Sequence, residues 1–157
     1  MSNLSVLNSP VPTFSLPATS GVTFNLTDYL GKNLVIYFYP KDSTPGCTTQ
    51  GMQFRDHYTE FTALNTEIVG VSRDSLKSHE NFKAKFSFHF ELLADTEELA
   101  CGIFGVMKQK NMYGKQVRGV ERSTFIIDKN GICIHEMRGV KADGHAEAVL
   151  ALIKTIS

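Results

Sequence analysis

The sequence predicts an α/β fold with a central mixed β-sheet and helices on both faces. Short apolar runs of strand composition alternate with longer segments whose apolar residues recur at helical spacing. Strands that are separated by helices imply parallel pairing with right-handed crossovers. An Asn130-Gly131 pair late in the chain predicts a β-hairpin, which would add an antiparallel edge.

The first half of the chain predicts a hairpin followed by two strand–helix units. Residues 14–30 indicate an N-terminal hairpin or loop with a short helical turn near 26–30. Residues 34–39 form a continuous apolar run, which is typical of a central strand buried on both faces. Apolar residues between 47 and 64 then recur at helical intervals, and 66–72 is a second buried strand.

The second half continues the alternation and closes with a hairpin and a helix. The expected elements are a helix over 75–87, a strand over 92–94, a helix over 96–105, a loop or hairpin excursion over 107–120, paired strands over 123–128 and 132–137, and a helix over 143–156. Since no repeat, low-complexity tract or composition shift marks a linker, we expect residues 1–157 to form a single domain.

Composition excludes some classes of function. The 157 residues include 16 basic and 16 acidic side chains, so the formal net charge is zero. A nucleic-acid-binding domain usually shows a basic excess, and a small or neutral substrate fits this balance better. The N-terminus lacks the charged and apolar regions of a secretory signal, and no apolar run approaches the roughly 18 residues of a membrane span. We therefore expect a cytoplasmic protein.

The cysteines and histidines narrow the chemistry. Three cysteines, Cys47, Cys101 and Cys133, are present without a Cys-x-x-Cys pair, which argues against a disulfide framework. The five histidines form no close pair with metal-ligand spacing. Gly-rich nucleotide motifs are also missing. We expect neither a metal nor a cofactor, and the question becomes whether one cysteine is reactive.

Cys47 lies where a buried strand passes into a helix. Thr44 is a good N-cap and Pro45 suits the first helical position, so Cys47 falls in the first turn. The free N–H groups and the positive end of the helix dipole there favour a thiolate over a thiol. The Thr44 hydroxyl can donate to a bound oxygen, and Pro40 can shield the sulfur from water. The competing interpretation is a packed cysteine that acts as a small hydrophobe.

Pro40-x-x-x-Thr44-x-x-Cys47 resembles the signature of the peroxiredoxins. The fuller segment 37–48 is similar to the bacterioferritin-comigratory-protein, or PrxQ, subfamily. The likeness extends along nearly the whole chain through Phe54-Arg55-Asp56, Val69-Gly70-Val71-Ser72, Ser78-His79, Asn81-Phe82, Leu93-x-Asp95 and the segment from Arg122 to Asp128. It implies a thioredoxin-like fold.

The resemblance also implies an activity, that of a thioredoxin-dependent peroxiredoxin in antioxidant defence. Cys47 would attack the terminal oxygen of hydrogen peroxide or an organic hydroperoxide and become a sulfenic acid. Thr44 would hydrogen-bond the peroxide and Pro40 would cover the site. Arg122 would stabilise the thiolate and the polarised O–O bond, a role that suits a planar, permanently charged donor. Without the motif, we would interpret Arg122 as an exposed charge at the end of a strand, paired with Glu121.

The sequence departs from the subfamily where many members carry a resolving cysteine. Met52 and Lys83 occupy the two usual positions. Cys101 and Cys133 remain, but each lies in an apolar pattern typical of the core, and a disulfide needs Cα atoms within about 7 Å. We therefore expect a one-cysteine cycle completed by thioredoxin, glutaredoxin or glutathione, and the resemblance suggests a monomer.

Other functions fit less well. A thioredoxin-like binding or chaperone module, with Cys47 merely packed, remains the main alternative. General disulfide exchange is disfavoured because no Cys-x-x-Cys occurs. The sequence gives little support for a Cys–His hydrolase, because His57 lies about 15 Å from Cys47 along the same helix and cannot act as its base.

Overall fold

The computed structural model describes residues 6–156; residues 1–5 and 157, which the single-domain prediction includes, lie outside the described residues. The elements in chain order are β1 (Ser15–Pro17), β2 (Thr23–Asn25), the 3₁₀ turn η1 (Leu26–Tyr29), β3 (Asn33–Phe38), α1 (Pro45–Ala63), β4 (Thr66–Ser72), α2 (Leu76–Phe86), β5 (Glu91–Ala94), α3 (Leu99–Phe104), β6 (Met107–Met112), β7 (Lys115–Val120), β8 (Ser123–Ile127), β9 (Cys133–Arg138) and α4 (His145–Ile156).

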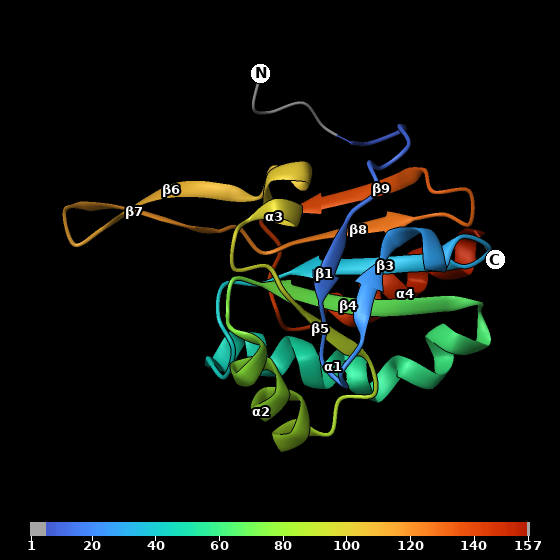
Figure 1. Cartoon of the computed structure of the whole chain (residues 1–157), viewed down its shortest axis with the longest axis horizontal. Helices are drawn as coiled ribbons and strands as arrows, with labels where there is room; N and C mark the ends of the chain where they lie inside the picture. Colours follow the sequence, from blue (N-terminus) through green and yellow to red (C-terminus); the bar gives the residue numbers. More distant parts are fainter. Residues whose placement is uncertain (1–5, 157) are drawn as a thin grey trace.

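A five-stranded sheet in the order β5-β4-β3-β8-β9 forms the centre of the molecule (Figure 1). β3 pairs parallel with β4, and β4 pairs parallel with β5. β8 pairs antiparallel with β3 on the other side, and β9 follows it as the antiparallel edge. The predicted mixed sheet, with parallel strands joined by helices and a terminal hairpin, is confirmed.

Each face of the sheet carries its own layer of side chains. Along β3, Leu34, Ile36 and Phe38 point to one face, while Val35 and Tyr37 point to the other, as the alternation of a strand requires. α3, η1 and the β1–β2 hairpin pack on the first face; α1, α2 and α4 pack on the second (Figure 1). Helices therefore lie on both faces, as predicted. Among residues 6–156, no helix combines the length and apolar character that a membrane span requires.

Helix α3 is shorter than the sequence predicts. It begins at Leu99 because Glu98 adopts a left-handed backbone with a φ of 61°. The Asp95 carboxylate accepts hydrogen bonds from the amides of Leu99 at 2.7 Å and Cys101 at 2.8 Å, which satisfies the first turn. Gly105, with a φ of 63°, ends the helix. The spacing of apolar residues alone predicts neither the start of this helix at Leu99 nor its end before Gly105.

The segment over 107–120 forms the hairpin β6–β7, a two-stranded sheet of its own that projects from the body of the molecule (Figure 1). Its strands pair over their whole length, from Met107↔Val120 to Met112↔Lys115. The turn residues Tyr113 and Gly114 have positive φ angles of 52° and 77°, which match the preferred two-residue hairpin turn. Of the two alternatives that the sequence leaves open here, the hairpin is correct.

Candidate active site

Cys47 lies in the first turn of α1, as predicted, and its side chain is 2% exposed. Thr44 is the N-cap residue and Pro45 takes the first helical position. The Thr44 hydroxyl does not cap the helix; it donates to the carbonyl of Lys41 at 2.8 Å. The Thr44 side chain therefore leaves the amides of the first turn uncovered. Pro40 is exposed in the loop that joins β3 to α1.

Arg122 lies directly before β8 and reaches the sulfur of Cys47. The register of β8 against β3 sets Ser123 opposite Phe38, which brings the preceding arginine to the end of β3 where α1 begins. One guanidinium nitrogen, Nη2, donates to Cys47 Sγ at 3.6 Å. This contact joins residues far apart in sequence and gives the sulfur a permanently charged donor.

Gln50 completes this arrangement, although no sequence motif singled it out. It lies one turn after Cys47 on the buried face of α1 and is 0% exposed. Its Oε1 accepts from Arg122 Nη1 at 2.6 Å, so both terminal nitrogens of the guanidinium have a partner. Among the described residues its Nε2 has no hydrogen-bond partner. The available signal was a polar residue three positions after Cys47 in an otherwise buried helical stripe.

Gly46 leaves room for the guanidinium. A Cβ at this position would lie 3.1 Å from Arg122 Nη2. Contacts that close are tighter than a Cβ normally tolerates, so a larger residue would push the side chain of Arg122. The small residue before Cys47 therefore permits the contact between arginine and sulfur.

The comparisons with known proteins agree with this geometry. Residues 7–136 match the model of the AhpC/TSA family. Peroxiredoxin Bcp of Xanthomonas campestris pv. campestris is 52% identical over 151 residues, which cover 95% of this chain and 94% of that protein. Peroxiredoxin Bcp of Bacillus subtilis is 44% identical over 151 residues and 96% of each chain. The chain belongs to the AhpC/TSA family, as a peroxiredoxin of the Bcp/PrxQ type.

Solved structures support the same assignment. A structure of Xanthomonas campestris peroxiredoxin Q superposes with a TM-score of 0.87 at 51% identity, over 90% of each chain. A Cys-to-Ser mutant of Xylella fastidiosa PrxQ gives a TM-score of 0.88 at 42% identity, over 98% of this chain and 92% of that one. The predicted thioredoxin-like fold and family are confirmed, and the protein is a thiol-dependent peroxidase.

In this peroxiredoxin, the loop before Cys47 is anchored by a buried polar network around Asp42. The Asp42 carboxylate accepts from the hydroxyls of Tyr39 at 2.6 Å and Ser78 at 2.8 Å, and lies 2.8 Å from His79 Nδ1. The other ring nitrogen of His79 lies 2.9 Å from the carbonyl of Leu93, which can only accept. Nε2 therefore donates to this carbonyl, while Nδ1 faces the Asp42 carboxyl group. The network ties the loop to α2 and β5.

Two neutral groups surround the charged arginine. Burial first, and the charge of Arg122 second, lower the pKa of His145 to about 4, so this histidine is neutral at pH 7. Burial, followed by the nearby Cys47 and Asp42, raises the pKa of Tyr37 well above its ordinary value. Its hydroxyl has no hydrogen-bond partner within the described part of the chain. Arg122 is thus the cation beside the sulfur.

The other cysteines of the peroxiredoxin lie on the opposite face of the sheet from Cys47. Cys101 in α3 and Cys133 in β9 pack into the first face, whereas Cys47 packs into the second. Both are 0% exposed, and all three cysteines are free. Burial raises the pKa of the Cys133 thiol to about 11 and that of Cys101 further above its ordinary value. Such thiols are poor nucleophiles at neutral pH.

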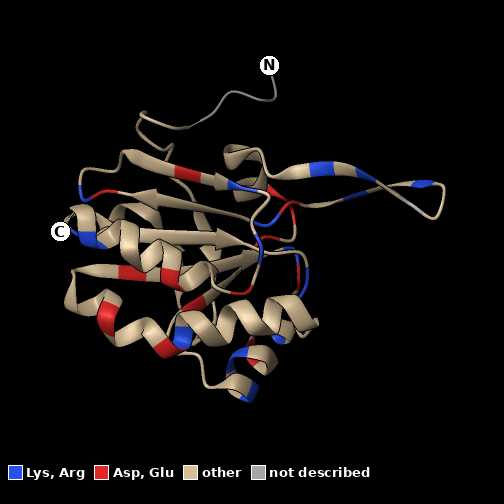
Figure 2. Ribbon diagram, turned by 180° about the vertical axis from the view of Figure 1, so that it is seen from behind, with Lys and Arg blue, Asp and Glu red and all other residues tan. Residues whose placement is uncertain are grey.

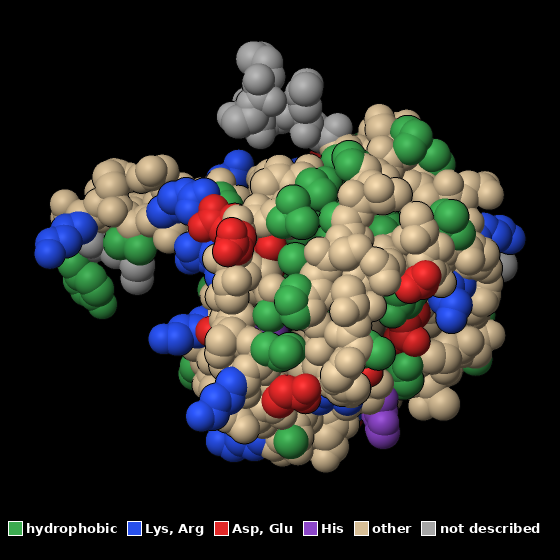
Figure 3. Space-filling model, viewed as in Figure 1, with side chains coloured by type: hydrophobic (Ala, Val, Ile, Leu, Met, Phe, Trp, Pro, Cys, Tyr) green, Lys and Arg blue, Asp and Glu red, His purple; other side chains and the backbone are tan. Residues whose placement is uncertain are grey.

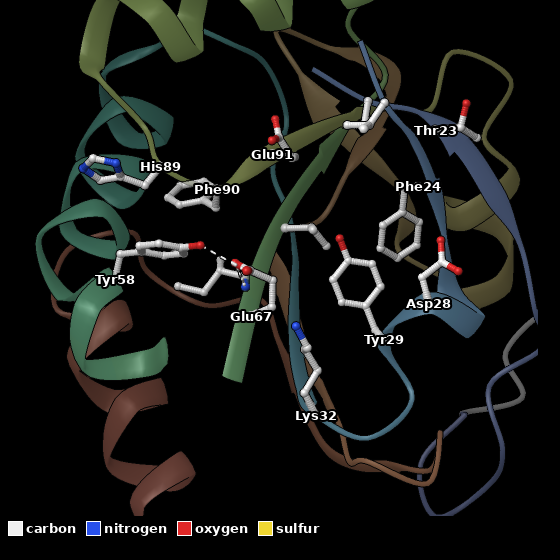
Figure 4. A pocket seen from close by; sticks show the side chains of 14 residues that line it. Thr23, Phe24, Asp28, Tyr29, Lys32, Tyr58, Glu67, His89, Phe90 and Glu91 are labelled. Carbon is white, nitrogen blue, oxygen red and sulfur yellow. Dashed lines mark hydrogen bonds between the residues drawn. The ribbon is translucent and has the colours of Figure 1, made fainter. Parts of the chain in front are cut away.

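A pocket of about 400 Å³ lies at the other end of the sheet and is separate from this site (Figure 4). Its lining includes Lys32, which directly precedes β3, and Glu67 and Glu91 near the starts of β4 and β5, whereas Cys47 follows the end of β3. Tyr29 and Tyr58 enter it from η1 and α1 (Figure 4). The pocket is therefore separate from the surroundings of Cys47.

Proposed function

We propose that Cys47 is the peroxidatic nucleophile and that Thr44, Arg122 and Pro40 form its immediate surroundings. The observation that supports this most directly is the Arg122 guanidinium 3.6 Å from a sulfur in the first turn of α1. Cation and helix terminus both favour the thiolate, which is the form that reacts. Thr44 orients the peroxide through its hydroxyl oxygen, which accepts from the peroxide O–H while its own hydrogen is donated to Lys41, and Pro40 covers the mouth of the site.

The chemical step is a displacement at oxygen. The Cys47 thiolate attacks the terminal oxygen of the hydroperoxide, an S–O bond forms and the O–O bond breaks. The leaving alkoxide or hydroxide takes a proton from water, and Cys47 is left as a sulfenic acid. Arg122 stabilises the charge that moves from sulfur onto oxygen. One Xanthomonas campestris relative is described in terms of alkyl peroxide reduction; we propose hydrogen peroxide and organic hydroperoxides as substrates here.

The return step uses an external thiol. A first thiol displaces water from the sulfenic acid to give a mixed disulfide, and a second thiol releases the Cys47 thiolate and leaves as a disulfide. The support is the placement of Cys101 and Cys133 across the sheet from Cys47, with Met52 and Lys83 at the usual resolving positions. Thioredoxin, glutaredoxin and glutathione are the candidate reductants.

The setting of the enzyme follows from the same features. We propose a monomer whose residues 1–157 act as one domain, since Cys47, Gln50 and Arg122 are all supplied by one chain around one sheet. A cytoplasmic location suits the three free cysteines, because the cytoplasm keeps thiols reduced.

A peroxidase assay on Cys47→Ser tests the nucleophile. With dithiothreitol as the reductant, we expect the variant to lose turnover while it keeps the circular dichroism spectrum of the wild type. In the wild-type protein treated with peroxide, we expect a sulfenic-acid trap to label only Cys47. Full activity in Cys47→Ser would contradict the proposal and favour the binding-module alternative.

The one-cysteine cycle has its own test. After peroxide treatment, we expect non-reducing mass spectrometry to find no intramolecular disulfide, and Cys101→Ala and Cys133→Ala to keep wild-type turnover. A Cys47–Cys101 or Cys47–Cys133 bond in most molecules would refute the cycle but leave Cys47 as the nucleophile.

A further inference from the structure

The charged side chains of the hairpin β6–β7 all have the same sign. Residues 107–120 carry four basic side chains and no acidic one, although the whole chain has a net charge of zero. The basic residues follow the projecting ribbon in Figures 2 and 3. Concentrated charge of one sign on a protruding element raises the encounter rate with a partner of opposite charge.

The register of the hairpin places three lysines on one face. Lys108 and Lys110 are two residues apart and so share a face of β6. Lys115 pairs opposite residue 112, two positions further along, and Val117 pairs opposite Lys110, so both lie on this face as well. Within the described part of the chain, none of the three lysines has a carboxylate at salt-bridge distance. We call Lys108, Lys110, Lys115 and Val117 the lysine face.

The opposite face of the hairpin is tied to the body. Arg118 donates to the carboxylate of Glu98 at 2.6 and 2.5 Å, and Glu98 also pairs with Arg73. This contact orients the base of the ribbon against α3 and leaves the lysine face free. Val117 on that face is 40% exposed, and Tyr113 at the tip is 99% exposed. A polar rim with exposed apolar and aromatic groups is the composition of a protein interface.

The ribbon starts beside the reacting sulfur. β7 ends at Val120, and Arg122, two residues later, contacts Cys47. The amide of Glu121 donates to the carbonyl of Val106 at 2.8 Å, which closes the base of the hairpin. In Figure 1 the ribbon leaves the molecule at the end of the sheet where β3 runs toward α1. A protein held on the ribbon would therefore lie next to the mouth of the site.

We propose that the lysine face docks an acidic protein dithiol, which reduces the Cys47 sulfenic acid. The inference rests on the proposed one-cysteine cycle, because that cycle obliges a thiol to arrive from outside at this end of the molecule. A peroxide or a small thiol can diffuse to Cys47 without a docking arm, whereas a protein reductant must be oriented. Its first thiol forms the mixed disulfide with loss of water, and its second thiol closes the reductant's own disulfide and releases Cys47.

Steady-state kinetics with two reductants test this. The variant is Lys108→Gln with Lys110→Gln and Lys115→Gln; the matched control is Lys85→Gln with Lys129→Gln and Lys154→Gln, three exposed lysines outside the hairpin. The protein reductant is an acidic thioredoxin regenerated by NADPH and thioredoxin reductase, and the small one is dithiothreitol. We expect KM for thioredoxin to rise roughly tenfold in the hairpin variant, with kcat and the dithiothreitol rate unchanged. Added NaCl should raise KM of the wild type and the control but barely change that of the variant.

Several outcomes would overturn the docking proposal. The first is an equal KM for thioredoxin in the hairpin variant and the control. The second is a wild-type enzyme that turns over with dithiothreitol but not with thioredoxin. The third is a lower rate with dithiothreitol in the hairpin variant. Retention of a fluorescent DNA duplex through the same lysines, with unchanged thioredoxin kinetics, would also overturn it. A wild-type protein inert with both thiols would instead contradict the proposed function.

Discussion

His79 and Asp42 form a buried polar contact, with Nδ1 2.8 Å from Oδ2 and side chains 0% and 2% exposed. The pair joins α2 to the loop that carries Pro40 and Thr44. Removing one partner leaves a buried polar group without its hydrogen bond, which costs about 1–3 kcal/mol.

We therefore expect Asp42→Asn and His79→Gln each to lower the free energy of unfolding by about 1–3 kcal/mol. The double variant should lose less than the sum, because the two side chains interact directly. Urea denaturation of the four proteins measures the coupling. Single variants as stable as the wild type would show that this contact does not stabilise the fold.

Arg122→Gln removes the cation beside Cys47 while it keeps a polar side chain. Loss of one donor to a developing charge lowers rates by about 10²–10³-fold, so we expect a fall of that order in kcat/KM for peroxide. Stopped-flow oxidation of the reduced enzyme measures it. Arg55→Gln, a change on α1 at a residue bonded to Asp56 and Phe86, is the control and should react like the wild type.

Gln50 acts through Arg122, which makes it a positioning residue. Gln50→Leu removes the acceptor of the 2.6 Å bond, and we expect peroxide oxidation to slow about tenfold, since hydrogen bonds to charged groups contribute about 1.5–3 kcal/mol. Gln50→Glu keeps an acceptor and should restore most of the rate. If Leu and Glu variants react alike, the bond does not position the arginine.

Gly46→Ala tests the space that the guanidinium needs. The added Cβ would lie 3.1 Å from Arg122 Nη2, and we expect it to displace the side chain and slow peroxide oxidation about tenfold. Gly102→Ala on α3, where a Cβ would meet nothing within 4 Å, is the matched control and should leave the rate unchanged. An equally fast Gly46→Ala enzyme would show that Arg122 can shift without loss.

His145 makes stability depend on pH. Its pKa is lowered to about 4 in the folded protein from an ordinary value of 6.5, so the unfolded chain binds the proton first as pH falls. The contribution is complete above pH 6.5 and is lost between pH 6.5 and 4, to a total of about 3 kcal/mol. We expect Tm of the wild type to fall over this window more steeply than Tm of His145→Gln. Parallel curves would assign the acid sensitivity to other groups.

Much of the architecture could be predicted from the order of residues. Buried strands β3 and β4 are continuous apolar runs, and the helices show apolar stripes, because burial acts on each segment separately. The first-turn position of Cys47 also follows from its immediate neighbours Thr44 and Pro45. Local patterns failed at α3, whose start depends on Asp95 and on the left-handed Glu98.

The site itself was only partly accessible from local patterns. Arg122 is 75 positions from Cys47, and their contact depends on the pairing of β8 with β3. Gln50 becomes significant only once that arginine is in place. The core character of Cys101 and Cys133 could be predicted from their apolar surroundings, but their separation from Cys47 by the sheet could not. Neighbouring residues determine backbone conformation, whereas strand order and register determine which distant side chains meet.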